Sequence, residues 1–336
     1  MGTGLDALDR RRMGRLAGAF AAALGLAASK AARAEAAPGK TYASGWTDAP
    51  SAYWELLRPD QATGKPVIVM VPGGGHTASC YLATADGRPG WAHDFAQAGH
   101  PVLLVDWPGT GRSGYVAPDA LTGEVVCAGL ALAIATTGQP VVLLTHSMSG
   151  PYGWRLLDQI GDCITQLVAI APGPPGNIQP WPDVVQETAD EIEIRGTTNY
   201  VLNRKAPFVA SPAFVRSKLI GKSMQFPQDQ TERYAASLIT IPPRLLQQRL
   251  NIDGSQLRVE NFTHYAGKPV LLVTGTDDVD HPRDLDAGVV DWLRQSGAKG
   301  EHLYLADKGI TGNGHMMMLE RNSRDIAQVI MAWIGA

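Results

Sequence analysis

The sequence predicts a doubly wound α/β fold whose mainly parallel sheet has about eight strands. Short runs rich in Val, Leu and Ile recur without polar alternation, which indicates strands that are buried on both faces. Stretches of helical length separate these runs, as the crossovers between parallel strands require. The chain has 336 residues and no visible internal repeat, so one large domain with an insertion accounts for its length.

Each expected element follows from this pattern. The buried strands share an apolar, β-branched composition and cover residues 66–71, 101–106, 140–146, 167–171, 269–275 and 302–305. An earlier stretch, residues 53–57, could supply an antiparallel edge strand. The helices that should cover the sheet lie at residues 91–98, 121–137, 153–160, 284–296 and 323–334.

One long segment, residues 177–264, interrupts the alternation of strands and helices. It has no strong buried strand, but it has polar, aromatic and Pro-punctuated stretches of helical character. We expect a helical cap inserted over the strand ends, with ordinary packing helices as the alternative. Residues 35–176 and 265–336 then form the core. Ligands bind beyond the carboxyl ends of strands in open α/β sheets, so a cap there would shape the substrate pocket.

Residues 1–34 have the features of a secretory signal peptide. Residues 1–15 are basic, residues 16–28 are apolar, and a small-x-small cleavage site ends at Ala34. Three consecutive arginines, residues 10–12, precede a weakly apolar core, which favours the twin-arginine route. The apolar run is shorter than the roughly 20 residues of a membrane span. We therefore expect a periplasmic or secreted protein with no membrane segment after cleavage.

Charge and cysteine content exclude several classes of protein. A net charge of −3, spread without blocks, argues against nucleic acid or an anionic membrane surface as the main partner. Cys80, Cys127 and Cys163 can form at most one intramolecular pair, and their spacing matches no metal site. We expect all three to be buried as small apolar residues. Whether two of them pair stays open, as does the oligomeric state.

The residues around Ser147 favour a serine nucleophile. Ser147 directly follows the predicted strand 140–146, and an amphipathic segment begins just after it. A serine at such a strand-to-helix turn has a strained backbone, so its near neighbours must be small. Thr145 and Ser149 occupy these positions in a relaxed version of the Gly-x-Ser-x-Gly pattern. The alternative is a buried strand that ends in an ordinary serine-capped helix.

A serine nucleophile also needs donors for an oxyanion and a base that accepts its proton. A glycine run follows the strand 66–71, and we expect the N–H groups of Gly74 and Met148 to be the donors; a flexible turn is the alternative. His315 comes after the last strand in a glycine-rich loop, which suits the base. His146 is expected to face away from the serine and to pack, because successive residues at a strand end face opposite sides.

The acid that orients the base is expected in the turn after the strand 269–275. Asp277, Asp278 and Asp280 are all candidates in that turn. A Gly-x-x-Asp spacing favours Asp278, and the other two are then solvated turn carboxylates. The chain order serine, acid, histidine is the order typical of one large class of serine hydrolases.

Taken together, these residues resemble the α/β-hydrolase superfamily over almost the whole mature chain. The run from Asp106 to Ser113 looks like the Asp-x-x-Gly-x-Gly-x-Ser turn that follows the fourth strand in these enzymes. A closer likeness, to a branch of bacterial secreted serine esterases typified by esterase 713, rests on residues 86–91, 145–150 and 314–322. The resemblance implies an α/β-hydrolase fold.

The resemblance also implies the roles of single residues. Ser147 would be the nucleophile, His315 the base, and Gly74 with Met148 the oxyanion donors. In the esterase 713 branch the acid is a glutamate at the end of the strand after the nucleophile, where this chain has Ala171. That acid cannot be carried over. Either the role has moved to the aspartate turn or the triad is incomplete.

The sequence thus predicts a secreted serine hydrolase that cleaves carboxylic esters through an acyl-enzyme. It implies no metal and no cofactor, and the substrate is a small-molecule or polymeric ester. The same scaffold also supports amide, lactone, polyester and C–C bond hydrolysis. A non-catalytic binding protein on a hydrolase-like scaffold is the alternative from another class.

Overall fold

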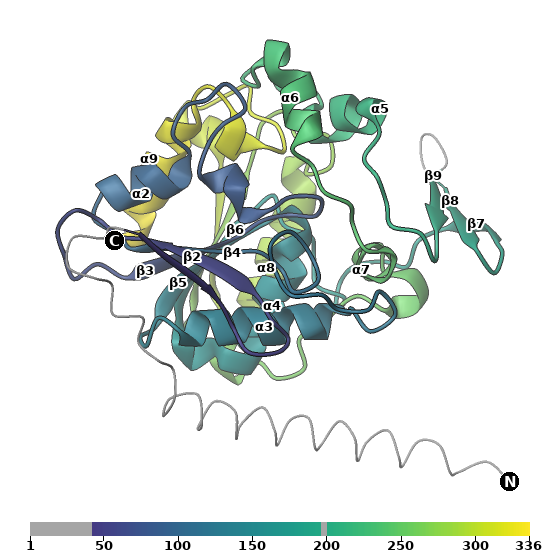
Figure 1. The fold of residues 1–336 in the computed structure, drawn as a ribbon, viewed down its shortest axis with the longest axis horizontal. Helices are drawn as coiled ribbons and strands as arrows, with labels where there is room; N and C mark the ends of the chain where they lie inside the picture. Colours follow the sequence, from purple (N-terminus) through teal and green to yellow (C-terminus); the bar gives the residue numbers. More distant parts are fainter. Residues whose placement is uncertain (1–41, 196–199) are drawn as a thin grey trace, which may run out of the picture.

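The computed structural model describes residues 42–195 and 200–336, which form a sheet between two layers of helices (Figure 1). The eight-stranded sheet has the order β1-β2-β4-β3-β5-β6-β10-β11. Only β2 runs against the direction of the other strands, and it pairs antiparallel with both β1 and β4, so the predicted mainly parallel sheet is confirmed. The edge position expected for residues 53–57 is taken by β1. Its strands are β1 (Tyr42–Trp46), β2 (Tyr53–Leu57), β3 (Val67–Val71), β4 (Val102–Val105), β5 (Val141–His146), β6 (Ile164–Ile170), β10 (Pro269–Thr274) and β11 (Lys299–Tyr304).

Helices cover both faces of this sheet (Figure 1). Two of them, α2 (Trp91–Gln97) and α9 (Ser323–Ile334), pack on one face. The other face is covered by α3 (Gly123–Ala135), α4 (Gly150–Ile160) and α8 (Arg283–Gln295). α4, α8 and α9 have an apolar stripe toward the sheet, whereas α3 is apolar nearly all round and largely buried. Full burial of each Leu or Ile stabilises the fold by roughly 1.5–3 kcal/mol.

The sheet register brings the ends of several strands to one edge. β5 lies between β3 and β6, with Thr145 opposite both Val71 and Ala169. On the far side of β6, Val273 of β10 lies opposite Ile170. Because these strands are parallel, the loops that follow them all leave from the same edge. That edge carries the residues predicted to be functional.

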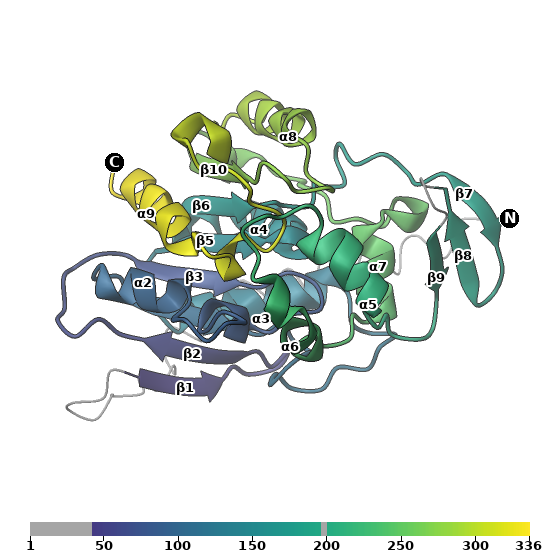
Figure 2. The ribbon, with the colours of Figure 1, turned by 90° about the horizontal axis from the view of Figure 1, so that it is seen from above.

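The segment predicted to be a helical cap contains a second sheet, so that prediction was wrong in part. An antiparallel sheet of β7 (Val184–Glu187), β8 (Glu191–Ile194) and β9 (Tyr200–Asn203) projects beside the helices of the segment (Figure 2). Its strands are short, β7 is exposed throughout, and β8 and β9 each bury a single residue, so they lack the continuous apolar run by which the core strands are recognised. The helices of the segment are α5 (Pro212–Phe214), α6 (Thr231–Ala236) and α7 (Pro243–Arg249).

Two other expectations concern membrane and redox chemistry. The proposed signal peptide, residues 1–34, lies outside the described residues. Within residues 42–195 and 200–336, no helix is both long enough and apolar enough to cross a bilayer. Cys80 and Cys127 are buried, Cys163 is partly buried, and all three are free thiols. Burial raises the pKa of the Cys80 and Cys127 thiols, which makes them poor nucleophiles.

Candidate active site

The nucleophile turn connects the central strand β5 to α4. Ser147 has a φ of 53°, in the left-handed region that residues other than glycine rarely adopt. Such strain persists only where neighbouring contacts enforce it. Ser149, in place of the usual glycine, provides some of them: its Oγ accepts the N–H of His146 at 2.9 Å and lies 2.8 Å from the His146 carbonyl. The tight turn presents Ser147 at the carboxyl edge of the sheet.

The structure brings Ser147, His315 and Asp278 into one hydrogen-bonded line. The Nε2 atom of His315 lies 2.7 Å from Ser147 Oγ, and its Nδ1 atom lies 2.8 Å from Asp278 Oδ2. Asp278 follows β10 and His315 follows β11, so three separate loops at the same sheet edge supply the three groups. A serine, a base and an orienting carboxylate in this arrangement are the parts needed for nucleophilic catalysis.

The other two aspartates of the turn do not reach His315. Asp280 pairs with Lys218 at 2.5 Å, and both side chains are exposed. Asp277 donates its backbone N–H to the Asn313 carbonyl at 2.8 Å, while its carboxylate makes no hydrogen bond within the described part of the chain. Of the three candidates, only Asp278 can orient the imidazole.

Burial and the charge of the partner shift the pKa of His315, and likewise that of Asp278, in opposite directions. Burial lowers the pKa of His315, but the charge of Asp278 and the hydrogen bond to it outweigh burial, so the pKa is raised overall. Burial raises the pKa of Asp278, but the charge of His315 and the same hydrogen bond hold the pKa well below its usual range. The aspartate therefore stays ionised and favours an imidazole that gains a proton.

The glycine run after β3 lies against the nucleophile turn. A Cβ atom on Gly74 would lie 2.5 Å from Met148 Sδ, so any side chain here would displace the methionine from the loop. The Gly74 N–H makes no hydrogen bond among residues 42–195 and 200–336. The loop is fixed instead by His76, whose Nδ1 lies 2.8 Å from the Gly74 carbonyl and whose Nε2 lies 2.9 Å from the Tyr234 hydroxyl. Burial lowers the pKa of His76 to about 4, which keeps this histidine neutral.

His146 packs beneath the base and not against the serine hydroxyl. The side chain is buried, and its Nε2 atom lies 3.0 Å from the His315 carbonyl. Its ring centroid is 4.9 Å from that of His315. Burial, with the nearby imidazoles, lowers the pKa of His146, so it is neutral and supports the His315 loop without adding charge.

A buried carboxylate that sequence reasoning did not assign holds the same loop. Glu320 accepts the Gly314 N–H at 2.7 Å and the Asn313 side-chain amide at 2.6 Å, and the Ser223 hydroxyl lies 2.5 Å away. Burial raises the pKa of Glu320. Glu320 thus ties the residues on the N-terminal side of His315 to the inserted segment. A glutamate at the end of an apolar methionine run was the signal that could have identified it.

Two of the sequence runs that resemble esterase 713 meet in space. Arg88 donates to the carbonyl of Glu320 at 3.0 Å and to that of Arg321 at 3.1 Å. The indole N–H of Trp91 donates to the Ser323 carbonyl at 2.8 Å. The first run therefore fixes the backbone just after the histidine loop.

A second histidine–aspartate pair lies beside the first. The His281 ring stacks on His315 with centroids 5.4 Å apart, and its Nδ1 atom lies 2.9 Å from Asp286 Oδ1. Asp278, His281 and His315 form a group whose possible metal-ligating atoms lie within 4.8 Å of one another. Both nitrogens of His315 already face protein partners, so a metal there would have to break the line to the serine. The geometry fits a hydrogen-bonded site better than a metal site.

The position of the glutamate in the esterase 713 branch has no carboxylate here. Ala171 follows β6, is fully buried, and has a φ of 40°. Its N–H donates to the Val273 carbonyl at 2.9 Å, so the backbone of this corner is fixed without an acidic side chain. The carboxylate beside His315 comes instead from the loop after β10, the next strand of the sheet.

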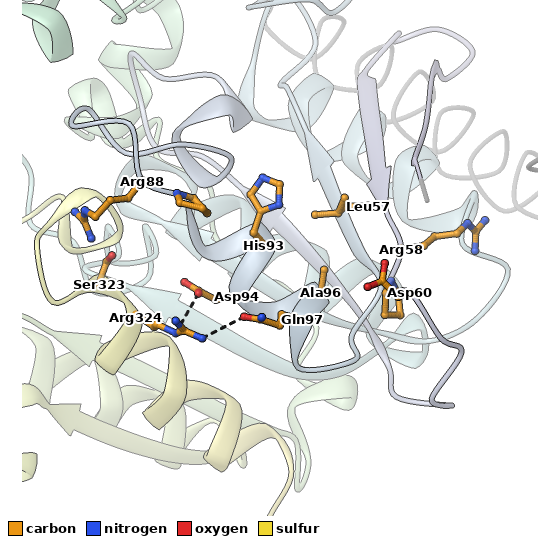
Figure 3. Close-up of a pocket in the computed structure, with 12 residues that line it drawn as sticks. Leu57, Arg58, Asp60, Arg88, His93, Asp94, Ala96, Gln97, Ser323 and Arg324 are labelled. Atoms are coloured by element: carbon orange, nitrogen blue, oxygen red, sulfur yellow. Dashed lines mark hydrogen bonds and ion pairs between the residues drawn. The ribbon is translucent and has the colours of Figure 1, made fainter. Parts of the chain in front are cut away.

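A surface pocket between α2 and α9 is separate from these residues (Figure 3). Arg324 lies there 3.1 Å from the Gln97 side-chain oxygen and 3.6 Å from an oxygen of Asp94. Neither Ser147 nor His315 lines this pocket. We therefore place the candidate site at the strand ends and not in this pocket.

Known proteins resemble the chain over most of its length. The profile of the Alpha/beta hydrolase family matches residues 68–329. A probable secreted lipase, phiG, of Fungal sp. (strain ATCC 74256) is 27% identical over 347 aligned residues, which cover 84% of this chain and 85% of that protein.

Solved structures show the same fold at low sequence identity. A novel bacterial esterase is 18% identical with a TM-score of 0.52, and the match covers 89% of this chain and 97% of that one. An esterase from Thermogutta terrifontis is 15% identical with a TM-score of 0.58, over 88% of this chain and 98% of that one. The narrower likeness to the esterase 713 branch stays a prediction.

Proposed function

The chain belongs to the alpha/beta hydrolase family, and from this premise we propose that it is a secreted serine hydrolase that cleaves carboxylic esters. The observation that carries the proposal is the line from Asp278 through His315 to the hydroxyl of Ser147. The names of the similar proteins, a lipase and two esterases, support an ester as the substrate.

In the first half of the reaction, Ser147 Oγ attacks the ester carbonyl while His315 Nε2 accepts the hydroxyl proton. Asp278 stabilises the imidazolium that forms. The N–H groups of Gly74 and Met148 donate to the oxyanion, each contributing roughly 3–4 kcal/mol to transition-state binding. The tetrahedral intermediate then collapses, and His315 gives its proton to the departing alcohol. The acyl group remains on Ser147.

In the second half, water replaces the alcohol. His315 accepts a proton from water as the oxygen attacks the acyl carbonyl, and the same two N–H groups stabilise the second oxyanion. Collapse breaks the bond to Ser147 Oγ, which recovers its proton from His315. The products are a carboxylic acid and an alcohol, and no metal or cofactor takes part in any step.

Two further parts of the proposal concern location and the inserted segment. A signal peptide at residues 1–34 would export the protein, and the name of the similar secreted lipase agrees with this. Residues 177–264 would act as a cap, because they contact the loops of the site. The Ile239 N–H donates to the Gly75 carbonyl at 2.9 Å, and the Gln225 N–H donates to the Gly312 carbonyl at 3.1 Å.

The proposal is tested by removing the hydroxyl group of Ser147. Ser147→Ala should reduce turnover of a short-chain aryl ester on the order of 10⁶-fold while the thermal unfolding midpoint stays close to that of the wild type. The wild type should react with a fluorophosphonate probe and the variant should not. Ser79→Ala, which removes an exposed serine bonded to Thr77, is the matched control. Full activity or full labelling of the Ser147 variant would disprove the proposal.

A further inference from the structure

A cation from the inserted segment lies beside the nucleophile turn. Arg249 is the last residue of α7, and its guanidinium faces Gly173. A Cβ atom on Gly173 would lie 2.9 Å from Arg249 Nε and 3.2 Å from its Cζ, so the glycine leaves the space that the guanidinium occupies. The N–H of the same glycine donates to the Ser147 carbonyl at 2.8 Å. One backbone residue therefore separates this charge from the nucleophile.

Among residues 42–195 and 200–336, the guanidinium of Arg249 has no partner. Within the described residues it makes no hydrogen bond and no ion pair, although none of its nitrogens is sealed from solvent. Other partly buried arginines differ: Arg112 pairs with Asp106 at 2.9 Å, and Arg155 pairs with Asp158 at 2.6 Å. A partly buried cation without a partner loses part of its hydration and gains no ion pair in return, so folding gains nothing from this placement.

The surroundings of Arg249 indicate which anion would fit. Burial lowers the pKa of Arg249, and Asp280 partly offsets this, which places one negative charge close by. That charge is already paired with Lys218, so the guanidinium stays available. Two carboxylates near the site, Asp278 and Asp280, would repel a doubly charged group more than a singly charged one. The planar fork of an arginine matches a carboxylate with two parallel hydrogen bonds.

We propose that Arg249 is a substrate-binding residue that selects esters carrying a carboxylate. The inference rests on the proposed esterase function, since the bound acid group would belong to the ester that Ser147 attacks. A short spacer between the two carbonyl groups of the substrate would allow both contacts at once. The acid group would also hold the ester in a fixed orientation, which lowers the entropic cost of reaction.

The experiment compares matched esters in the full-length protein and its variants. On the acyl side, para-nitrophenyl monoesters of glutaric and adipic acids are compared with pentanoate and hexanoate esters. On the alcohol side, para-carboxyphenyl butyrate is compared with phenyl butyrate. Arg249→Gln should lower kcat/KM for the acid ester roughly 10- to 100-fold in at least one comparison, the range for a charge-assisted hydrogen bond. At a pH above the acid limb of the rate profile, kcat/KM for the neutral ester should change less than about twofold.

Two variants serve as controls. Arg244→Gln removes the same charge from the same helix, where the guanidinium donates to the Asp119 carbonyl at the surface, and should leave both rates unchanged. Arg249→Lys keeps the charge without the fork and should retain part of the preference. Equal losses for acid and neutral esters, or no loss for either, would overturn the inference. The function itself fails separately, if Ser147→Ala stays active.

Discussion

Two histidine–aspartate pairs lie side by side at the carboxyl edge of the sheet. They differ in the contact made by the histidine ring nitrogen that does not face the aspartate. His315 bonds Asp278 at 2.8 Å and His281 bonds Asp286 at 2.9 Å, with the two rings stacked at 5.4 Å. The second nitrogen of His315 faces the hydroxyl of Ser147 at 2.7 Å. In the part of the chain that the structure describes, His281 has no nucleophile of this kind.

The second pair belongs to a buried structural chain. Asp286 also receives the hydroxyl of Thr274 at 2.6 Å, and Thr274 Oγ1 lies 2.9 Å from His302 Nε2. These bonds connect the first turn of α8 to the end of β10 and to β11. A histidine bonded to a carboxylate is therefore not sufficient to identify a base, because a nucleophile must also be within reach.

The largest expected difference between the pairs is kinetic. Asp278→Asn removes the charge that raises the pKa of His315 and favours the wrong tautomer, so kcat should fall on the order of 10⁴-fold. Initial rates on a para-nitrophenyl ester measure this loss. Asp277→Asn is the matched control, because the Asp277 contact is made by its backbone. A near-normal rate for the Asp278 variant, with the loss at Asp277 or Asp280 instead, would assign the acid to another residue.

Some residues of the site can be predicted from the sequence and others cannot. The glycine run, the turn at Ser147 and the late His315 follow from local patterns and from chain order, so they could be predicted. The choice among the three aspartates depends on how the turn after β10 is folded, which spacing indicates only weakly. Arg249 approaches the site from α7 of the inserted segment, so no local pattern marks it. His281 follows Asp278 by only three residues, but spacing does not show that its ring stacks on His315.

The elements of the fold also differ in how well the sequence predicts them. Strands buried on both faces have continuous apolar runs, and these were predicted within a few residues. The strands that were missed, β1 and β7 to β9, have exposed residues along their length. In β8, Glu191 and Ile192 begin an exposed–buried alternation that is too short to separate from a loop or a helix turn by periodicity alone.

A smaller effect is expected when the second pair is broken. Asp286→Asn weakens the hydrogen bonds to His281 and Thr274, so the free energy of unfolding should fall by roughly 1–3 kcal/mol. The fold-change in kcat should be tenfold or less, since the line to Ser147 remains. Urea unfolding and initial rates measure the two effects. Asp284→Asn, an exposed change in the same first turn of α8, is the control for the helix dipole. A 10⁴-fold rate loss with wild-type stability would place the second pair in the chemistry.

The smallest expected effect is a shift in the pH dependence of the rate, caused by the charges that surround His315. Burial lowers the pKa of His315, Asp278 and then Asp280 raise it, and Arg249 lowers it. Because the base must be neutral, kcat/KM rises with pH through this pKa. Asp280→Asn removes a cause that raises the pKa, so the acid limb should move to lower pH. Arg249→Gln removes a cause that lowers it, so the limb should move to higher pH.

Salt provides the control for this prediction. Asp280 is exposed, so its effect on the acid limb should shrink as ionic strength rises, because salt screens exposed charges more strongly than buried ones. The effect of Asp278, which is buried, should persist. Profiles of kcat/KM against pH for a neutral ester, recorded at low and high salt, measure both. If the Asp280 and Arg249 variants shift the limb in the same direction, His315 is not the group that the profile reports.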